Sequence, residues 1–442
     1  MKLFNKLNNF NNYTALTYLN ENITYNDIQK KIIIFKSIIP KNSLLVLVSS
    51  NRIIPIIFYI FAIKYNCQII ILDENHTNEF IKKTIKNFKP NYIFYPRSKK
   101  NFLKKKNLLI SDYYLCKLEK RIDNKINKKN SLILTTSGTT SNPKFVRISQ
   151  QNIFENTYQI QKYLKINKTH KTITTLPMAY SYGLSVINTH LEFGGRIYLN
   201  DISPVNINFW KTIKSKKINS FSTVPQICEF LKKIKFHKLL SKNLKYLTVA
   251  GGKTSQQTLE YMRNVCKLNK INFFVMYGQT EASPRMTYIN LTKINKINSI
   301  GKPLSGGKIK IVNNEILYFG KNVSLGYATN IKDLYRGDEN KGKLYTGDLG
   351  TKDTNGFIYI TGRKKRISKL FGLRIDLDDI EAYLRKGGYN VNLNISDEKL
   401  DIIYYRKYSE EKIKKYVNLN YNINKNYISC VYKKQKTKNI FK

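Results

Sequence analysis

The segment from residue 132 to Lys144 constrains this chain more than any other. Residues 132–134 form an apolar run that predicts a buried strand, and this strand enters a loop of Thr, Ser and Gly that ends in Pro143 and Lys144. Small hydroxyl side chains and a flexible backbone let several N–H and O–H donors converge on one anion, to which Lys144 adds a positive charge. The segment therefore indicates a polyphosphate-binding loop. The spacing of the Walker loop is absent, and a Thr-rich surface loop is the alternative.

Three more motifs follow in order along the chain. They are Tyr277-Gly-Gln-Thr-Glu281, Tyr345-Thr-Gly-Asp348 and the basic run at residues 362–374. With the loop, they resemble the adenylate-forming superfamily, which contains acyl- and aryl-CoA synthetases, peptide-synthetase adenylation domains and luciferases. Four ordered motifs are stronger evidence than any one of them. Shorter matches extend the resemblance over nearly the whole chain, at residues 23–27, 176–178, 224–225, 250–252, 299–303 and 325–327.

The charge of the chain is strongly positive but dispersed. Lys and Arg number 77 against 29 Asp and Glu, a formal net charge of +48, and 42% of the residues are hydrophobic. That apolar content indicates a globular protein, and 442 residues are enough for two or three domains. A nucleic-acid-binding protein is one alternative for so basic a chain. We expect no specific nucleic-acid binding, because the basic residues are spread along the sequence and an A/T-rich genome also favours Lys, Asn, Ile and Tyr.

Cysteine and histidine follow no pattern typical of a disulfide framework or a metal site. The five cysteines and four histidines are scattered without paired or ligand spacing, so a reducing cytosol is the expected compartment. The first residues lack the apolar core of a signal peptide. The longest apolar stretch, residues 53–63, contains Pro55 and is too short to span a bilayer. We therefore expect a cytoplasmic protein with no membrane span, in which residues 53–63 form a buried helix.

The order of apolar segments predicts an α/β fold. Continuous apolar runs such as residues 44–49 alternate with helical segments, as in parallel sheets buried on both faces. Residues before Asn130 are expected to form a first α/β subdomain, and short strands with Gly turns beyond Asn298 indicate a β-rich one. The resemblance implies a large N-terminal AMP-binding domain of stacked, mostly parallel α/β subdomains plus this β-rich subdomain at residues 1–362. It also implies a small, mobile α+β C-terminal lid at residues 363–442.

The phosphate-binding loop suits attack of a carboxylate on the α-phosphorus of ATP. Two anions meet in that reaction, so positioning and charge neutralisation dominate catalysis. Lys144 is the expected catalytic cation of the loop, although Ser141 stands where the superfamily usually has Gly. The other residues are expected to hold the departing β- and γ-phosphates: Thr136, Ser137, Gly138, Thr139 and Thr140.

The resemblance gives roles to the residues of the second motif. Tyr277 stacks on adenine, Thr280 contacts the α-phosphate and Glu281 binds Mg²⁺, which prefers oxygen ligands and bridges carboxylate to phosphate. A surface acid beside a turn is the alternative for Glu281. Gly251 and Gly252 let the backbone approach the nucleobase closely, or form an ordinary turn.

The third motif is expected to hold the sugar of the nucleotide. Asp348 is an acceptor-only group that suits a pair of ribose hydroxyls, and Arg363 can donate to the same sugar. An ordinary hairpin turn is the alternative for residues 345–348.

The C-terminal segment is expected to move and to carry one more catalytic group. Lys365 falls where the family places the hinge on which the lid rotates between adenylation and thiol transfer. The family ends with Pro-Lys-x-x-x-Gly-Lys, whose last lysine neutralises the substrate carboxylate and the α-phosphate. Here Ile440 and Phe441 replace the Gly and Lys, so a one-residue shift gives the role to Lys442, with Lys438 as the other candidate. A degenerate member that binds ATP but turns over poorly is therefore an alternative.

The acid substrate is expected to lie against residues 177–184. Tyr180 stands where many acyl-CoA synthetases have His, and with Gly183 it is assigned to the pocket, although core packing is the alternative for the tyrosine. No acidic residue occurs at residues 176–185, so the ammonium of an α-amino acid would be unpaired there. We expect an ATP- and Mg²⁺-dependent, AMP-forming ligase for an uncharged acyl or aryl acid. The expected acceptor is CoA or the phosphopantetheine of a separate acyl carrier protein.

Overall fold

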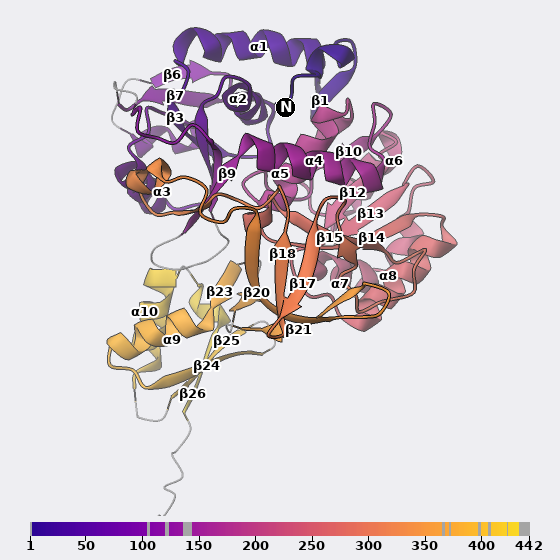
Figure 1. The fold of residues 1–442 in the computed structure, drawn as a ribbon, viewed down its shortest axis with the longest axis vertical. Coiled ribbons are helices and arrows are strands. Elements are labelled where there is room, and N and C mark those ends of the chain that lie inside the picture. The colour runs from indigo at the N-terminus through magenta and orange to yellow at the C-terminus, as the bar shows by residue number, and fades with distance from the viewer. Residues whose placement is uncertain are drawn as a thin grey trace, which may run out of the picture. The chain divides into compact units, whose positions relative to one another are not determined.

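The computed structural model describes residues 2–103, 107–119, 123–135, 144–364, 367–370, 373–396, 399–404, 408–421 and 423–432. These residues form two compact units, which are shown in Figure 1 and described one at a time. The first unit lies within Met1–Thr135, Phe145–Thr346 and Gly350–Thr361, and the second within Thr136–Lys144, Gly347–Leu349 and Gly362–Lys442.

The first sheet of the first unit has a parallel centre and antiparallel edges. Its central strand places Leu45 and Leu47 in one apolar core and Val46 and Val48 in another. Side chains of a strand alternate between its faces, so an uninterrupted apolar run is what burial on both sides requires. Across the sheet the order is β19 (Gly326–Ala328), β9 (Phe145–Ser149), β8 (Asn130–Thr135), β4 (Gln68–Asp73), β3 (Leu44–Ser49), β5 (Tyr92–Pro96), β7 (Tyr113–Lys117) and β6 (Asn107–Ile110).

The second sheet is also parallel in its middle and antiparallel at both ends. The order is β16 (Lys302–Pro303), β15 (Arg285–Asn290), β14 (Asn272–Gly278), β13 (Tyr246–Val249), β12 (Ser220–Thr223), β10 (Lys171–Ile173), β11 (Arg196–Leu199), β1 (Thr14–Tyr18) and β2 (Glu21–Thr24).

The helices of the first unit have clear sequence causes. Helix α1 begins at a capping box in which Thr24 and Asp27 satisfy each other's backbone N–H groups. Helix α2 is apolar on every side and buried, as expected for residues 53–63. Figure 1 shows α4 and α5 side by side, and both contribute to the core that also receives residues of α1 and α2. The bounds are α1 (Tyr25–Ile38), α2 (Ile53–Lys64), α3 (Asn78–Phe88), α4 (Gln150–Leu164), α5 (Ser181–Glu192), α6 (Ile207–Ser215), α7 (Pro225–Lys233) and α8 (Gln256–Leu268).

A smaller sheet lies beyond Asn298, where the sequence predicts a β-rich region. Its order is β17 (Lys308–Val312), β18 (Glu315–Phe319), β20 (Lys343–Lys352) and β21 (Ile358–Arg363). Short 3-10 helices connect elements of the chain: η1 (Leu7–Phe10), η2 (Arg97–Phe102), η3 (Phe236–Leu239), η4 (Thr280–Ala282), η5 (Ile331–Tyr335) and η6 (Lys425–Tyr427).

The second unit has its own apolar core. Its described residues include two helices and a three-stranded sheet that share this core. The core contains Ile380 and Leu384 of α9, Val417 of α10, and Leu400 and Ile402 of the sheet. Its elements are β22 (Ile367–Leu370), β23 (Leu373–Asp376), α9 (Leu377–Lys386), β24 (Val391–Ser396), β25 (Lys399–Tyr404), α10 (Glu410–Tyr421) and β26 (Ile428–Tyr432).

Two expectations need correction, while the α/β class is confirmed. Residues before Asn130 do not form a closed subdomain, because β8, β9 and β19 complete the first sheet whereas β1 and β2 join the second. Residues 345–348 lie inside β20, so the hairpin-turn alternative for them is wrong. Within the described residues, no helix combines the length and the apolar character needed to cross a membrane.

Candidate active site

The motif at residues 277–281 leaves the second sheet at the end of β14. Gln279 donates its backbone N–H to the carbonyl of Pro284 over 2.9 Å, and Ala282 donates to the carbonyl of Gln279 over 2.9 Å. A Cβ on Gly278 would lie only 2.0 Å from the oxygen of Pro284, so no other residue fits this close approach of two backbone segments. The turn that follows therefore holds residues 280–282 in the short helix η4.

Glu281 is a buried carboxylate with one hydrogen-bonded oxygen. Only 4% of the residue is exposed, and its Oε1 accepts a hydrogen bond from the hydroxyl of Tyr327 over 2.9 Å. Among the described residues, nothing donates a hydrogen bond to Oε2, although that atom is also buried. A buried carboxylate oxygen without a partner is unfavourable. Glu281 is thus built to receive a cation or a donor that is not part of the described chain, and the surface-acid alternative does not fit its burial.

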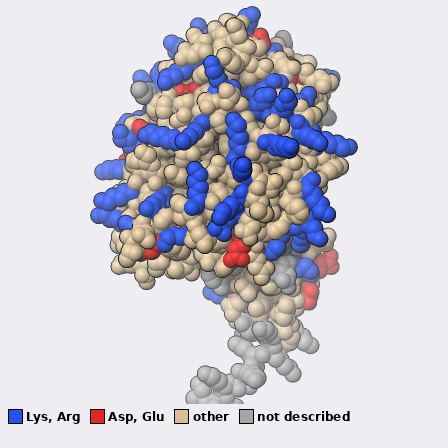
Figure 2. Space-filling model, turned by 90° about the vertical axis from the view of Figure 1, so that its right-hand side faces the viewer, with Lys and Arg blue, Asp and Glu red and all other residues tan. Residues whose placement is uncertain are grey.

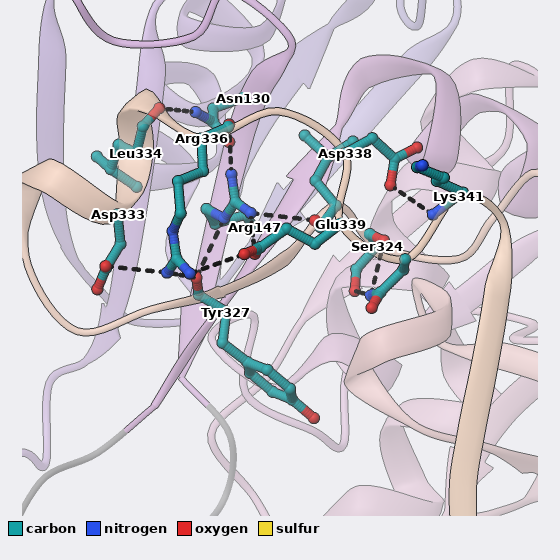
Figure 3. Close-up of polar contacts among 12 residues, drawn as sticks. Asn130, Arg147, Ser324, Tyr327, Asp333, Leu334, Arg336, Asp338, Glu339 and Lys341 are labelled. Atoms are coloured by element: carbon teal, nitrogen blue, oxygen red, sulfur yellow. Dashed lines mark hydrogen bonds and ion pairs between the residues drawn. The ribbon is translucent and has the colours of Figure 1, made fainter.

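Tyr327 is held in place by β9, the strand that follows the predicted phosphate-binding loop. β19 pairs antiparallel with β9, with Tyr327 opposite Val146. The fully buried guanidinium of Arg147, also in β9, donates to the carbonyls of Tyr327 over 3.2 Å and Arg336 over 2.7 Å, and it pairs with Glu339. Figure 3 shows this cluster, with the Tyr327 side chain pointing away from Arg147. The cluster fixes the backbone from which the Tyr327 hydroxyl reaches Glu281.

Gln279 connects the motif to the strand that carries the third motif. Tyr277 is buried near the end of β14. The Nε2 of Gln279 donates to the carbonyl of Thr346 over 2.8 Å, and the hydroxyl of Thr346 donates to the carbonyl of Ile316 over 2.7 Å. These bonds hold β20 beside the motif at Thr346. In the sequence, Thr346 stands two positions before Asp348.

Thr280 contacts the helix expected to bear the acid pocket. Its Oγ1 lies 3.1 Å from the Oγ of Ser181, the first residue of α5. Tyr180 precedes that helix and is half-buried, and burial raises the pKa of its hydroxyl to about 12, so the group is a neutral phenol at pH 7. A Cβ on Gly183 would lie 2.3 Å from the oxygen of Pro177. The glycine therefore lets the first turn of α5 pack directly on the segment before it.

In the second unit, Asp348 and Arg363 form an ion pair. The Nε of Arg363 lies 2.6 Å from Oδ1 of Asp348, whose side chain is 1% exposed while that of Arg363 is 35% exposed. Lys364 donates its backbone N–H to the carbonyl of Gly347 over 2.8 Å. The structure thus brings these two predicted residues together, from β20 and β21.

The remaining predicted residues are placed in part. Gly251 follows β13 with φ +91°, a conformation that favours glycine, and Gly252 comes next. Lys144 is exposed, one residue before β9. The other predicted site residues lie outside the described residues: Thr136, Ser137, Gly138, Thr139, Thr140, Lys365, Lys438 and Lys442.

The sequence matches a known family over most of its length. The model of the family described as "AMP-binding enzyme" matches residues 3–327. The chain belongs to this AMP-binding enzyme family.

Two similar curated proteins carry the same name. The 2-succinylbenzoate–CoA ligase of Listeria monocytogenes is 28% identical over 258 residues, which cover 57% of this chain and 53% of that protein. The 2-succinylbenzoate–CoA ligase of Oceanobacillus iheyensis is 28% identical over 263 residues, covering 57% of this chain and 53% of that protein. The chain therefore spans about half the length of the curated relatives it matches.

Solved structures share the fold over nearly the whole chain. The o-succinylbenzoate CoA synthetase of Bacillus subtilis, a double mutant bound to a product analogue, has a TM-score of 0.78 at 17% identity and covers 98% of this chain and 95% of its own. An artificially fused adenylation–PCP di-domain from Klebsiella oxytoca has a TM-score of 0.73 at 16% identity, covering 99% and 95%. At these identities the likeness shows the fold alone.

Some residues of this AMP-binding family member were not predicted as site residues. Tyr327 lies within a short match at residues 325–327, which was the available signal. No sequence motif marks Ser181 or Arg147. Ser181 contacts Thr280, which is 99 residues away in the sequence, and Arg147 contacts Glu339, which is 192 residues away.

Proposed function

We propose that this chain is an ATP-dependent, AMP-forming acid–thiol ligase. A carboxylate attacks the α-phosphorus of ATP and displaces pyrophosphate, which gives an acyl-adenylate. A thiol then attacks the acyl carbon and releases AMP, which gives a thioester. CoA is the acceptor that fits the matched relatives, which are named as CoA ligases. A separate acyl carrier protein is the other acceptor that we retain from the sequence.

The free buried oxygen of Glu281 is the observation that carries this proposal. Carboxylate oxygen is a ligand that Mg²⁺ prefers, and Mg²⁺ usually takes its other ligands from water and substrate phosphates. Among the described residues no three His, Cys, Asp or Glu side chains cluster as a metal site, so a bound ion would depend on the nucleotide. When bound, Mg²⁺ would offset the phosphate charge that opposes attack by a second anion. The residues present therefore fit Mg²⁺ brought by ATP.

The residues around Glu281 have roles in binding and orientation. Tyr327 fixes one carboxylate oxygen, which leaves Oε2 for the ion. Thr280 presents its hydroxyl beside Ser181 and is retained as the α-phosphate contact. Tyr277 is retained as the adenine contact. Two solved structures of the Bacillus subtilis o-succinylbenzoate CoA synthetase, which share this fold at TM-scores of 0.69 and 0.64, are complexes with AMP and with ATP and magnesium ion.

The predictions for the other motifs are kept as part of the proposal. Lys144 and the loop of residues 136–140 would hold the pyrophosphate, and Asp348 with Arg363 would hold the ribose. Residues 363–442 would act as a lid that turns at Lys365 and supplies Lys442. We also retain a cytoplasmic location.

The acid proposed for this ligase is an aryl acid of the 2-succinylbenzoate type. The name of the matched relatives supports this choice. The nucleic-acid-binding alternative gains no support, because Figure 2 shows Lys and Arg side chains distributed over the visible face, without confinement to one stripe.

The test is Mg²⁺-dependent exchange of pyrophosphate into ATP with 2-succinylbenzoate as the acid. Glu281→Gln keeps the size of the side chain but removes its charge, and Glu281→Ala removes the ligand. We expect both variants to lower exchange by about 100-fold or more, since one electrostatic contact to a reacting phosphate commonly contributes that much. The matched control is Glu79→Gln, an exposed glutamate of α3. Exchange that survives intact in both Glu281 variants would contradict the role of this carboxylate. A wild-type protein that binds ATP but exchanges with no acid would support the degenerate alternative.

A further inference from the structure

Arg285 is a buried cation next to the candidate active site. It is the first residue of β15, four residues after Glu281, and only 3% of it is exposed. Asn156 fixes its backbone from both sides, because the Asn156 Nδ2 donates to the carbonyl of Arg285 over 2.8 Å and its Oδ1 accepts the Arg285 N–H over 3.3 Å. The position of the Arg285 backbone is therefore set by the fold.

Among the described residues, the guanidinium of Arg285 contacts only neutral groups. Nη1 donates to the hydroxyl of Tyr163 over 2.7 Å and approaches the Sδ of Met276 at 3.2 Å, and Nη2 donates to the Oγ of Ser185 over 3.2 Å. The guanidinium carbon lies 5.1 Å from the ring centre of Tyr182. Among the described residues, the buried Nε has no hydrogen-bond partner.

The surrounding titratable groups do not supply a negative charge. Burial raises the pKa of Tyr163 and raises that of Tyr182 to about 12, and it lowers the pKa of His190 to about 3. All three are neutral at pH 7. No carboxylate of the described residues pairs with Arg285. Arg147, another fully buried arginine of the described residues, pairs with Glu339.

A buried charge without a counter-ion is costly to maintain. Removing a guanidinium from water carries a penalty of several kcal/mol in real proteins, which an opposite charge in good geometry offsets. Hydroxyl partners and the face of an aromatic ring recover only part of that penalty. The site therefore favours an anion from outside the described chain.

The place of Arg285 indicates which molecule brings that anion. Ser185, which accepts its hydrogen bond, lies one helical turn after Ser181 on α5, so the two side chains project from the same face about 5–6 Å apart. Ser181 in turn lies 3.1 Å from Thr280. A molecule that extends along this turn of α5 would have one end at Thr280 and the other at Arg285.

We propose that Arg285 determines substrate specificity by pairing with a second carboxylate of the acid. The inference rests on the proposed function, in which the first carboxylate reacts at Thr280 and Glu281. A guanidinium can bind a carboxylate through two parallel hydrogen bonds, and its free Nε–H is one of the donors that such a pair uses. The proposal revises the expectation of an otherwise uncharged acid and names the substrate class as dicarboxylic acids. 2-Succinylbenzoate, for which the matched relatives are named, has two carboxylates.

The test compares acids that differ only in the second carboxylate. The pairs are 2-succinylbenzoate with 4-oxo-4-phenylbutanoate, phthalate with benzoate, and adipate with hexanoate. For each pair the ratio of kcat/KM values in pyrophosphate exchange is measured in the wild type, in Arg285→Met and in Arg285→Lys. Arg263→Met is the control, because Arg263 donates to the carbonyl of Leu291 from α8 and lies outside the proposed site.

We expect the wild type to prefer the dicarboxylic member of at least one pair by about 10- to 100-fold. Arg285→Met should bring that ratio close to one, chiefly by raising KM for the dicarboxylic acid, while Arg285→Lys retains part of it and Arg263→Met all of it. Arg285→Met should also melt at or above the temperature of the wild type, because it removes an uncompensated buried charge. A destabilised Arg285→Met variant with equal losses for both acids of a pair would show a structural role and overturn the inference.

Two further outcomes separate this inference from the function on which it rests. A wild type that exchanges only with acids carrying one carboxylate overturns the role of Arg285 and leaves the ligase proposal standing. A folded wild type that binds ATP and exchanges with no acid of the panel overturns the ligase proposal itself.

Discussion

The hydroxyl of Tyr327 donates a hydrogen bond to Oε1 of Glu281 over 2.9 Å, across 46 residues of sequence. The bond uses one oxygen of a buried carboxylate and leaves the other without a partner in the described chain. Tyr327 itself stands on β19, which β9 and the buried Arg147 hold in place. A structural cluster therefore supports the geometry of the proposed magnesium ligand.

Tyr327→Phe should weaken the use of Mg²⁺ without unfolding the protein. The change removes only the hydroxyl, and a hydrogen bond to a charged group contributes about 1.5–3 kcal/mol. We expect the Mg²⁺ concentration for half-maximal pyrophosphate exchange to rise by about tenfold, with ATP binding in the absence of Mg²⁺ unchanged. Tyr13→Phe, at an exposed tyrosine, is the matched control. An unaltered Mg²⁺ titration in Tyr327→Phe would show that the hydroxyl does not orient Glu281.

Arg147→Met should destabilise the first unit strongly. The buried guanidinium donates hydrogen bonds to the carbonyls of Leu325, Tyr327 and Arg336. Each buried acceptor that is left without a donor costs about 1–3 kcal/mol. We expect a loss of about 3 kcal/mol or more, seen as a lower urea midpoint. Glu339→Gln should cost less than Arg147→Met, because the amide oxygen can still accept a hydrogen bond from Arg147 and the side chain of Glu339 is 40% exposed, so water can approach its side of the contact. The reverse order of the two losses would refute this account of the cluster.

Gly183→Ala should weaken binding of the acid substrate more than binding of ATP. The new Cβ would lie 2.3 Å from the oxygen of Pro177, so the first turn of α5, which carries Ser181, must move. A displacement of about 1 Å can lower a rate about 100-fold. We expect KM for the acid to rise at least tenfold by this reasoning, with KM for ATP changing much less. Gly337→Ala is the control, because a Cβ there meets nothing closer than 4.0 Å. Equal effects on both substrates would place the acid elsewhere.

His190 should make the fold sensitive to acid. Its Nδ1–H donates to the carbonyl of Val186 over 2.8 Å, and burial lowers its pKa to about 3. Between that value and the unfolded pKa of about 6.5, the unfolded chain binds more protons than the folded chain. The stability that the neutral His190 contributes is therefore fully present above pH 6.5 and is lost as the pH falls toward 3. The loss from this group between pH 7 and pH 5 is about 2 kcal/mol.

The slope of unfolding free energy against pH measures this effect. His190→Gln should flatten the slope between pH 7 and pH 5, whereas His237→Gln, at an exposed histidine, should leave it unchanged. His170 adds to the wild-type slope in the same direction, because burial lowers its pKa to about 4. A slope that is identical in the wild type and in His190→Gln would mean that His190 is not buried as a neutral group.

The sequence by itself determined the local structure and the order of the motifs. The apolar run at residues 44–49 requires burial on both faces of a sheet, and residues 53–63 can only be a buried helix, because local composition and period decide such elements. The motif Tyr277-Gly-Gln-Thr-Glu281 likewise marked Glu281 before its surroundings were known. The roles of Lys144, Lys442 and the loop between residues 136 and 140 remain predictions from that pattern.

Only the tertiary structure decided which distant segments meet. The register that sets Tyr327 opposite Val146 aims a hydroxyl at Glu281, and no local pattern encodes that register. The same holds for Arg285, which looks like an ordinary basic residue in the sequence. Folding places it against Ser185, 100 residues away, and no acid of the described residues pairs with it. Burial changes the energetics of a charge, because water solvates an arginine at the surface, whereas an arginine in the interior needs a counter-ion. The sequence therefore indicated the reaction, whereas our proposal for a second carboxylate on the acid rests on the tertiary structure.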